Sequence, residues 1–394
     1  IKEVVLYNTC MRGTKKTLID MSCGKGSDIR RWYNAKISFV LGVDYAGDNI
    51  TNTEDGAYAR YVNFHQRNKK VEKIPMIFVI GDSSKRFIDG RAGSTDEERD
   101  ILRSVFGRYK PLGPIPSLVD HEAAGNLQNG ADGMTCMFAL HYFFESKEKL
   151  DGLLRNIREC VKVGGYFFGC CFDGDSVFNF LKDISKGGTK TGKEKDSILW
   201  NIRKDYSEDE FEASEDSFGL KINIDFISIG SSHDEYLVSF PYFTERMKET
   251  GFELLNESEL KEVGLKHSTN SFGVSYDMAK ISGKNYVMGD AVKQFSFLNR
   301  WFIFKKRKQI TFEKEATEEQ YVPIAITAPR NVKGEQISLP RNEVLEEVSD
   351  EEEKYQEEVK KTIAVAPTAL ERTITVEVPT AVGKEEKVIE EEAA

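Results

Sequence analysis

Residues 17–28 constrain the fold most, because they predict a buried strand, a turn with two glycines and the start of a helix. Gly24 and Gly26 allow positive φ and a close approach of the backbone to a ligand. The helix N-terminus beyond them offers free N–H groups. A second apolar strand, residues 38–43, ends at Asp44, and a carboxylate about twenty residues after such a turn commonly binds ribose hydroxyls. The pattern predicts an α/β fold with a nucleoside-cofactor site.

The turn itself indicates which cofactor it suits. A dinucleotide fingerprint needs a third glycine, but Ile29 stands there, and Lys25 and Asp28 crowd the turn. Asp20, at the end of the first strand, can bind an ammonium group. These features favour S-adenosylmethionine, which carries a sulfonium and an amine but no phosphate. An ordinary strand–turn–helix with incidental glycines remains the alternative.

Apolar strands alternate with helical segments through residues 1–309, which is typical of a mostly parallel α/β sheet. Two longer polar segments, residues 83–130 and 172–235, are interpreted as insertions into this one domain. The expected strands are 17–21, 38–43, 76–80, 133–138, 165–171 and a last aromatic strand at 295–305, and the expected helices include 27–34 and 147–162.

The charge of the chain is divided unevenly. The whole sequence has 55 basic and 65 acidic residues and a net charge of −10. Residues 310–394 hold 21 acids and 10 bases, a net charge of −11, which leaves 45 bases and 44 acids, a net charge of +1, for residues 1–309. The last segment has almost no aromatic residues, so we expect a disordered acidic tail. The nearly neutral body can carry local basic patches for a polyanion.

Several sequence features bear on compartment and on metals. No apolar run reaches the length of a membrane span. The six scattered cysteines include no C-x-x-C pair, which predicts reduced thiols in an intracellular protein and no metal site. His65, His121, His233 and His267 form no metal pattern and are expected on the surface. A start at Ile1 rather than Met indicates a fragment of a longer protein.

Four further blocks lie in a particular order along the chain. Asp82 follows the third strand, where an adenine amino group would lie, and residues 136–145 follow the fourth. Residues 164–169 open the fifth strand, and residues 234–240 follow the second insertion. This arrangement resembles the mRNA cap (guanine-N7) methyltransferase family, and most of all the methyltransferase portion of capping enzymes of large DNA viruses. The resemblance implies a class I, Rossmann-like S-adenosylmethionine-dependent methyltransferase with a mostly parallel seven-stranded sheet.

The resemblance also implies roles for individual residues at the cofactor. Lys2 would reach the cofactor carboxylate, Asp44 would hold the ribose, and Asp82 with Ser83 would hold the adenine. Met137 stands where the family usually has Gln, so one polar contact to the cofactor is lost or supplied elsewhere. The complete implied cofactor set is Lys2, Asp20, Gly24, Gly26, Asp44, Asp82, Ser83 and Met137.

A second implied set would bind the cap. His141 and Tyr142 would face the guanine, and Glu235 would accept hydrogen bonds from its N1–H and N2 amine, which selects guanine over adenine and leaves N7 free. Guanine N7 has a free lone pair at neutral pH, so these residues position the base and none acts as a general acid or base. An aromatic residue expected in the last strand is replaced by Asn299, with Phe297 and Trp301 beside it.

The implied partner is 5′-capped RNA, and upstream capping domains or a stimulatory subunit would fit a protein of this kind. The expected protein is a monomer without membrane attachment, located inside the cell in the cytoplasm, a viral factory or virion, or the nucleus. Two alternatives stay open. Another class I methyltransferase, acting on a small molecule or protein, would keep Asp20, Gly24, Asp44 and Asp82 but have no use for Glu235. A catalytically inactive binding or regulatory module would not need to bind cofactor. The glycine turn disfavours a third class, NAD-dependent oxidoreductases.

Overall fold

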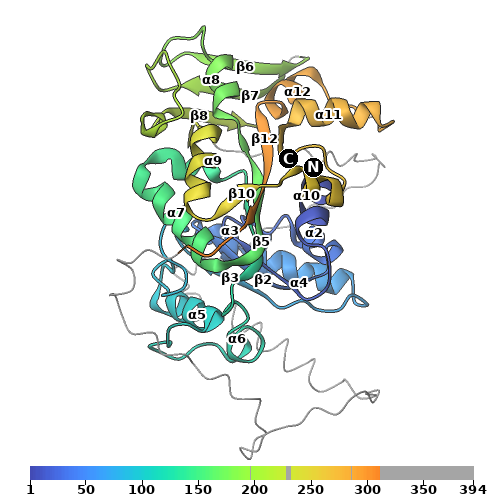
Figure 1. The fold of residues 1–394 in the computed structure, drawn as a ribbon, viewed down its shortest axis with the longest axis vertical. Helices are drawn as coiled ribbons and strands as arrows, with labels where there is room; N and C mark the ends of the chain where they lie inside the picture. The colour runs from blue at the N-terminus through green and yellow to red at the C-terminus, as the bar shows by residue number, and fades with distance from the viewer. Residues whose placement is uncertain (196, 228–231, 285, 311–394) are drawn as a thin grey trace, which may run out of the picture. The chain divides into compact units, whose positions relative to one another are not determined.

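The structure of the protein is a computed structural model that describes residues 1–195, 197–227, 232–284 and 286–310 (Figure 1). All of these residues belong to one compact unit. The predicted disordered acidic tail, residues 310–394, lies outside the described residues except for its first residue.

A mixed sheet with the strand order β10-β12-β5-β4-β1-β2-β3 forms the centre of this unit, and β11 pairs with β12 outside that path. Strands β1 to β5 are mutually parallel, whereas β12 runs antiparallel to β5, β10 and β11. The predicted Rossmann-like, mostly parallel seven-stranded sheet is therefore confirmed, with β11 as an additional strand. The bounds are β1 Lys16–Asp20, β2 Ile37–Asp44, β3 Met76–Ile80, β4 Ala131–Met137, β5 Val161–Phe172, β10 Phe252–Leu254, β11 Thr269–Ser271 and β12 Asn299–Lys306.

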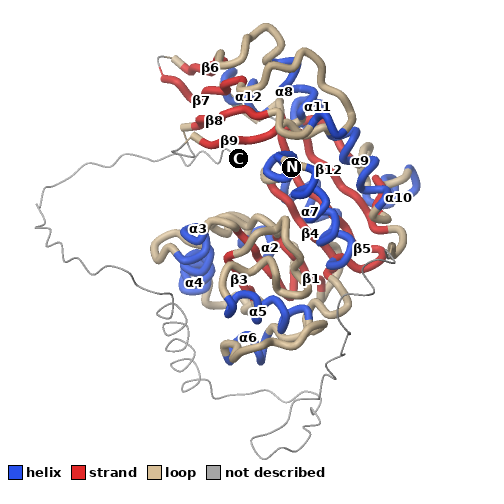
Figure 2. Tube along the Cα trace, turned by 90° about the vertical axis from the view of Figure 1, so that its left-hand side faces the viewer, coloured by secondary structure: helices blue, strands red, loops and turns tan. Residues whose placement is uncertain are grey.

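Helices cover both faces of the sheet (Figures 1 and 2). Side chains from α5, α6, α7 and α9 pack on one face, and side chains from η1, α1, α2 and α10 pack on the other. The bounds are η1 Lys2–Tyr7, α1 Asn8–Cys10, α2 Ile29–Asn34, α3 Gly47–Thr51, α4 Ala57–Arg67, α5 Asp96–Phe106, α6 Ser117–Glu122, η2 Leu140–Glu145, α7 Lys147–Cys160, α8 Gly174–Phe180, η3 Glu215–Ser217, α9 Phe240–Glu249, α10 Glu257–Val263, α11 Phe272–Ile281 and α12 Asp290–Ser296. No helix in the described part of the chain is long and apolar enough to cross a membrane.

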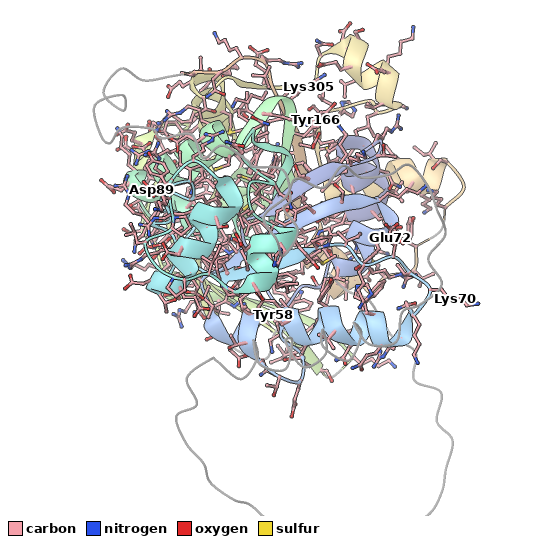
Figure 3. The ribbon with its side chains drawn as sticks, turned by 90° about the horizontal axis from the view of Figure 1, so that it is seen from below. Tyr58, Lys70, Glu72, Asp89, Tyr166 and Lys305 are labelled. Carbon is pink, nitrogen blue, oxygen red and sulfur yellow. The ribbon has the colours of Figure 1, made fainter. Side chains whose placement is uncertain are left out.

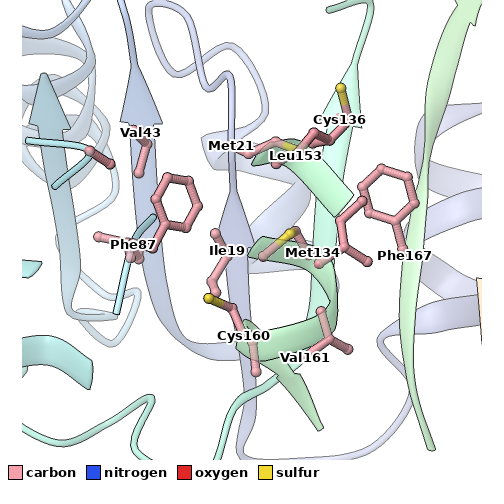
Figure 4. Packing of buried hydrophobic residues seen from close by; sticks show 14 of the residues in the cluster. Ile19, Met21, Val43, Phe87, Met134, Cys136, Leu153, Cys160, Val161 and Phe167 are labelled. Carbon is pink, nitrogen blue, oxygen red and sulfur yellow. The ribbon is translucent and has the colours of Figure 1, made fainter. Parts of the chain in front are cut away.

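Alternation along the strands divides the apolar core between the two faces. Ile19 packs with Val43 and Met134 on the face covered by α7 (Figure 4), whereas the neighbouring Leu18 packs on the opposite face. The adjacent Cys170 and Cys171 of β5 likewise belong to opposite clusters. The parallel strands are buried on both faces, which explains why they appear in the sequence as continuous apolar runs.

The second predicted insertion contains a sheet of its own. After α8, the strands β6 (Thr189–Glu194), β7 (Ser197–Lys204), β8 (Lys221–Phe226) and β9 (His233–Tyr236) form an antiparallel sheet in that order. One face buries Trp200 and Ile222 against Phe178 of α8, and the other is polar. Figure 1 shows this sheet in green beside α8 and α12. Every second residue is polar, so the composition of this segment conceals its apolar face.

Some predicted boundaries are wrong by a few residues. β12 begins at Asn299 rather than 295 because Phe295 and Ser296 belong to α12, and the Asn299 amide donates to both of their carbonyls at 3.3 Å. β5 begins at Val161 rather than 165, and Gly164 (φ +83°) lies in a β-bulge opposite β4.

The antiparallel pairing of β5 with β12 keeps a regular register as far as Tyr166. Tyr166 pairs with Lys305, and the two lie side by side in Figure 3. The Lys305 ammonium is 5.7 Å from the centroid of the Tyr166 ring.

Candidate functional site

The parallel strands bring several predicted site residues to one edge of the sheet. Asp20, Asp44 and Met137 are the last residues of β1, β2 and β4, and Asp82 follows β3 by two residues. The carboxyl ends of parallel strands form the usual ligand crevice of such a sheet, at the point where the strand order reverses. Here that point lies between β1 and β4.

The glycine turn after β1 is tied to the end of β2. Gly24 and Gly26 have φ values of +53° and +71°, as the sequence predicted. The Gly24 N–H donates to Asp44 Oδ2 at 2.7 Å, and Asp44 Oδ1 accepts from Ala46 N (3.0 Å) and Asn49 Nδ2 (2.9 Å). A Cβ at Gly24 would meet no atom within 4 Å, whereas one at Gly26 would lie 2.9 Å from Ile29 Cδ1. Gly24 therefore faces open space, whereas Gly26 faces the buried Ile29.

Asp20 is a buried acid with little local compensation. Its Oδ1 accepts one backbone hydrogen bond, from Ser22 N at 3.3 Å. Burial, and then the nearby Asp28 carboxylate, raise the pKa of Asp20 to about 7. A buried carboxyl in this state favours a cationic ligand group beside it, because such a group restores its ionised form.

Lys2 lies next to this acid but is engaged by Asp28. Its Nζ is 3.3 Å from Asp28 Oδ2 and 5.3 Å from the Phe138 ring centroid. Asp28 also accepts from Tyr7 OH at 3.3 Å and from Arg31 at 2.8 Å. Asp28 is thus the buried anchor of the N-terminal helix, a role that its place in the turn did not indicate.

The residues expected at the adenine end are held by their own turn. Asp82 Oδ1 accepts from Ser84 N at 2.9 Å and from Ser84 Oγ at 2.6 Å. The Ser83 hydroxyl donates to the Met21 carbonyl at 2.6 Å, so its proton is directed away from a ligand. Met137 is buried in an apolar cluster and pairs with Cys170, which gives it no polar role.

The residues expected at the cap form a buried pair beneath a partly exposed tyrosine. His141 Nδ1, from η2, lies 3.3 Å from Glu235 Oε2, from β9, without the alignment of a hydrogen bond. Both His141 nitrogens and Glu235 Oε2 are buried without a hydrogen-bond partner. Tyr142 is 44% exposed, and its ring centroid lies 4.1 Å from that of His141.

The ionisation of these groups follows from their surroundings. Burial lowers the pKa of His141; Glu235 opposes this shift, and His233 adds to it. Burial, Glu235 and then Asp44 raise the pKa of Tyr142 to about 12. Tyr142 therefore interacts electrostatically with one acid of each predicted set.

The sequence analysis missed one residue that contacts the His141–Glu235 pair. His233 was expected on the surface, but its side chain is half-buried and its Nε2 lies 2.8 Å from Glu235 Oε1. Strand alternation could have found it, because residues two apart in a strand share a face. Phe138 was also missed; it has φ +59° directly after β4, and its N–H donates to the Cys170 carbonyl at 2.7 Å.

Two residues near the expected aromatic position serve the structure. The Asn299 side chain caps α12 by donating to its last carbonyls, and Trp301 is buried with its Nε1 donating to Ser275 Oγ at 2.8 Å. Within the described ranges, no group of three or more His, Cys, Asp or Glu side chains could hold a metal ion.

The sheet order and the acids at its carboxyl edge define the class I, Rossmann-like methyltransferase architecture. The sequence profile of the mRNA (guanine-N(7))-methyltransferase domain matches residues 1–109 and 118–307. The chain belongs to this family.

Two relatives and one solved structure illustrate what the chain is similar to. The chain is 27% identical over 343 residues to a probable mRNA-capping enzyme of Acanthamoeba polyphaga mimivirus, covering 79% of this chain and 27% of that protein. It is 27% identical to the mRNA cap guanine-N(7) methyltransferase of Drosophila melanogaster, covering 62% of this chain and 48% of that protein. It thus spans between a quarter and a half of these relatives. The CcbJ methyltransferase from Streptomyces caelestis aligns with a TM-score of 0.42 and 10% identity, covering 78% of this chain and 89% of that one.

Proposed function

We propose that this chain transfers a methyl group from S-adenosylmethionine to N7 of the guanine in a 5′ RNA cap. The observation that carries the proposal is the buried His141–Glu235 pair, which has three unpartnered polar atoms. His141 contacts the Tyr142 ring, and both lie in η2, directly after the carboxyl end of β4. Membership of the cap methyltransferase family supports it.

The residues at the sheet edge fit the cofactor. Asp20 is a buried acid whose neighbouring cation, Lys2, is engaged by Asp28, and Gly24 faces open space. Asp44, held rigidly by three donors, would bind the ribose. Asp82 and the Ser83 backbone would hold the adenine, Lys2 would hold the carboxylate, and the bound cofactor would supply an electrophilic methyl group on a sulfonium.

The unpartnered atoms of His141 and Glu235 match the donors and acceptor on the Watson–Crick edge of guanine. Guanine presents an acceptor at O6 and donors at N1 and N2, so a His141 N–H can donate to O6 while Glu235 accepts from N1–H and the N2 amine. Adenine would place an acceptor against the carboxylate and leave it unpaired, a mismatch that sites built on buried polar groups reject strongly. N7 then remains free.

These residues act by position and charge. N7 attacks through a lone pair and loses no proton, so no base is required. Burial keeps His141 neutral at pH 7, since its pKa is lowered. The guanine becomes positively charged as N7 is methylated, and the Glu235 carboxylate stabilises that charge in a buried site.

The proposal also covers the substrate of the chain and the larger enzyme in which it acts. Capped RNA is the required substrate. The mimivirus protein, of which this chain spans 27%, supports a place for this chain in a longer capping enzyme that acts in a viral factory.

Methyl transfer from labelled S-adenosylmethionine to GpppA-capped RNA tests the function. We expect N7-methylguanosine after digestion and mass analysis, and no product from ApppA-capped RNA. Glu235→Gln, which keeps the shape of the side chain but not its charge, should lose most product. Cofactor binding without any transfer to the cap would favour another acceptor, and failure to bind cofactor would favour a non-enzymatic module.

A further inference from the structure

The strand β9 presents two side chains to the predicted cap pocket. In the antiparallel pairing with β8, Glu235 lies opposite Ile222 and His233 lies opposite Ile224. Both isoleucines are buried, so both β9 residues point to the inner face. Asp234, between them, points outward and accepts from Lys221 and Asn223. His233 and Glu235 therefore reach the pocket from the same side.

The two oxygens of Glu235 have different surroundings. Oε1 is 2.8 Å from His233 Nε2, whereas Oε2 is buried without a hydrogen-bond partner, 3.3 Å from His141 Nδ1. An ionised carboxylate only accepts, so His233 Nε2 must carry the proton and donate it. Among the described residues, His233 supplies the side-chain hydrogen bond that fixes the rotation of this carboxylate.

Lys204 is a second charged residue on the inner face, and it does not orient Glu235. Lys204 lies in the same cross-strand row as Glu235, two strands away through Ile222. Its ammonium, however, is 4.6 Å from the Tyr206 ring centroid, in an aromatic surrounding.

We propose that His233 is a positioning residue for guanine recognition, which orients the Glu235 carboxylate so that it meets both the N1–H and the N2 amine. This inference rests on the proposed function for the identity of the base. A carboxylate that rotates freely would keep the N1–H contact in some orientations but would lose the paired contact to N2. The contribution of His233 is therefore measured by comparing the binding of caps with and without the N2 amine.

Binding of the dinucleotides GpppA and IpppA tests the proposal, because the inosine cap lacks the N2 amine. The full chain should bind GpppA more tightly than IpppA. His233→Ala should weaken GpppA binding about tenfold, the size expected for a hydrogen bond to a charged group, and should reduce the GpppA/IpppA ratio towards that of Glu235→Ala. His233→Gln, which retains a donor, should restore the ratio. Asp234→Asn, on the outer face, is the matched control and should leave the ratio unchanged.

The outcomes separate this proposal from the proposed function. An unchanged ratio in His233→Ala, or an equal loss of GpppA and IpppA binding, overturns the positioning role, because a structural defect would weaken both ligands alike. Failure of the unmodified chain to distinguish the two dinucleotides overturns it as well. Discrimination that depends on His233, without methyl transfer to capped RNA, supports the positioning role and contradicts the proposed function.

Discussion

The Asp20 carboxyl has its pKa raised to about 7, mainly by burial and then by Asp28. The folded chain therefore binds this proton more tightly than the unfolded chain, and the unliganded protein loses stability as the pH rises from about 4 to about 7. A cationic ligand group beside Asp20 reverses the balance, since it binds the ionised form. We predict that S-adenosylmethionine affinity rises by up to about tenfold per pH unit below pH 7 and levels off above it.

Isothermal titration calorimetry between pH 5.5 and pH 8, in buffers of different ionisation enthalpy, measures this dependence (the pH range brackets the shifted pKa). Proton release on binding should be largest below pH 7. Asp20→Asn should bind more weakly with a flat profile. An unmodified chain with an equally flat profile would show that Asp20 does not face the cationic part of the cofactor.

Glu235 and His141 are predicted to affect the cap and not the cofactor. Glu235→Ala should lower kcat/KM for capped RNA by about 10–150-fold, since a hydrogen bond to a charged group contributes about 1.5–3 kcal/mol. His141→Ala should lower it by up to about tenfold, since a hydrogen bond between neutral groups contributes about 0.5–1.5 kcal/mol. Their affinity for S-adenosylmethionine should stay near that of the unmodified chain. Asp44→Ala should instead weaken the binding of S-adenosylmethionine, because Asp44 accepts a hydrogen bond from the glycine turn of the cofactor site. Loss of cofactor binding in Glu235→Ala would contradict this division.

At the level of single residues, the sequence predicted which residues lie at the cofactor edge better than it predicted their hydrogen-bond partners. Asp20 and Asp44 are the last residues of apolar strands and Gly24 lies in the turn after the first, so strand ends alone place them together. The direction of the Ser83 hydroxyl, towards Met21, depends on a contact 62 residues away, which no local pattern shows. His233 was missed because a lone polar residue in a polar segment looks exposed until its strand partner is known.

The glycine turn, as an element, offers a matched pair of substitutions. Gly24→Ala and Gly26→Ala both place an L-residue at positive φ, which costs roughly 1–2 kcal/mol. Gly26→Ala adds a clash with Ile29 and should lower stability further, whereas Gly24→Ala meets open space. We therefore predict that Gly24→Ala loses cofactor affinity with a small change in melting temperature, and that Gly26→Ala loses mainly stability. Calorimetry and thermal melting, applied to both variants, check this; equal cofactor affinity in Gly24→Ala and the unmodified chain would show that the ligand does not approach Gly24.

Among the elements, the central strands β2 and β3, which are buried on both faces, were predicted well. The sheet of β6 to β9, which has one solvent-exposed face, was not. β2 is mostly apolar and β3 wholly so, and their predicted bounds match closely. The sheet of β6 to β9 was interpreted only as a polar insertion, because Lys, Asn and Asp alternate with its buried Ile residues. The bulge at Gly164 was also invisible, since two glycines after a helix equally predict a helix end.

On the scale of the whole molecule, the opposite charges of the two regions have a consequence for RNA. Residues 310–394 contribute −11 to a net charge of −10, so the remaining residues carry +1. A polyanion is repelled by this segment over about one Debye length, which is roughly 10 Å at 0.1 M salt. The repulsion acts on the RNA chain and much less on a cap dinucleotide, because the number of phosphates differs.

We predict that truncation after residue 310 keeps methyl transfer to GpppA unchanged, since every proposed site residue lies before that point, and lowers KM for capped RNA a few-fold at low salt. The difference should disappear towards about 0.5 M salt, where the Debye length falls to a few Å. A full-length variant with the acids of 313–392 changed to Asn and Gln is the matched control; it should behave as the truncated chain does if charge is the cause. Initial rates at several salt concentrations, with RNA and with the dinucleotide, provide the measurement. A truncated chain with an unchanged KM for RNA at low salt would mean that the acidic segment lies too far from the RNA path to repel it, and a gain that persists at high salt would point to direct occlusion of the site instead of charge.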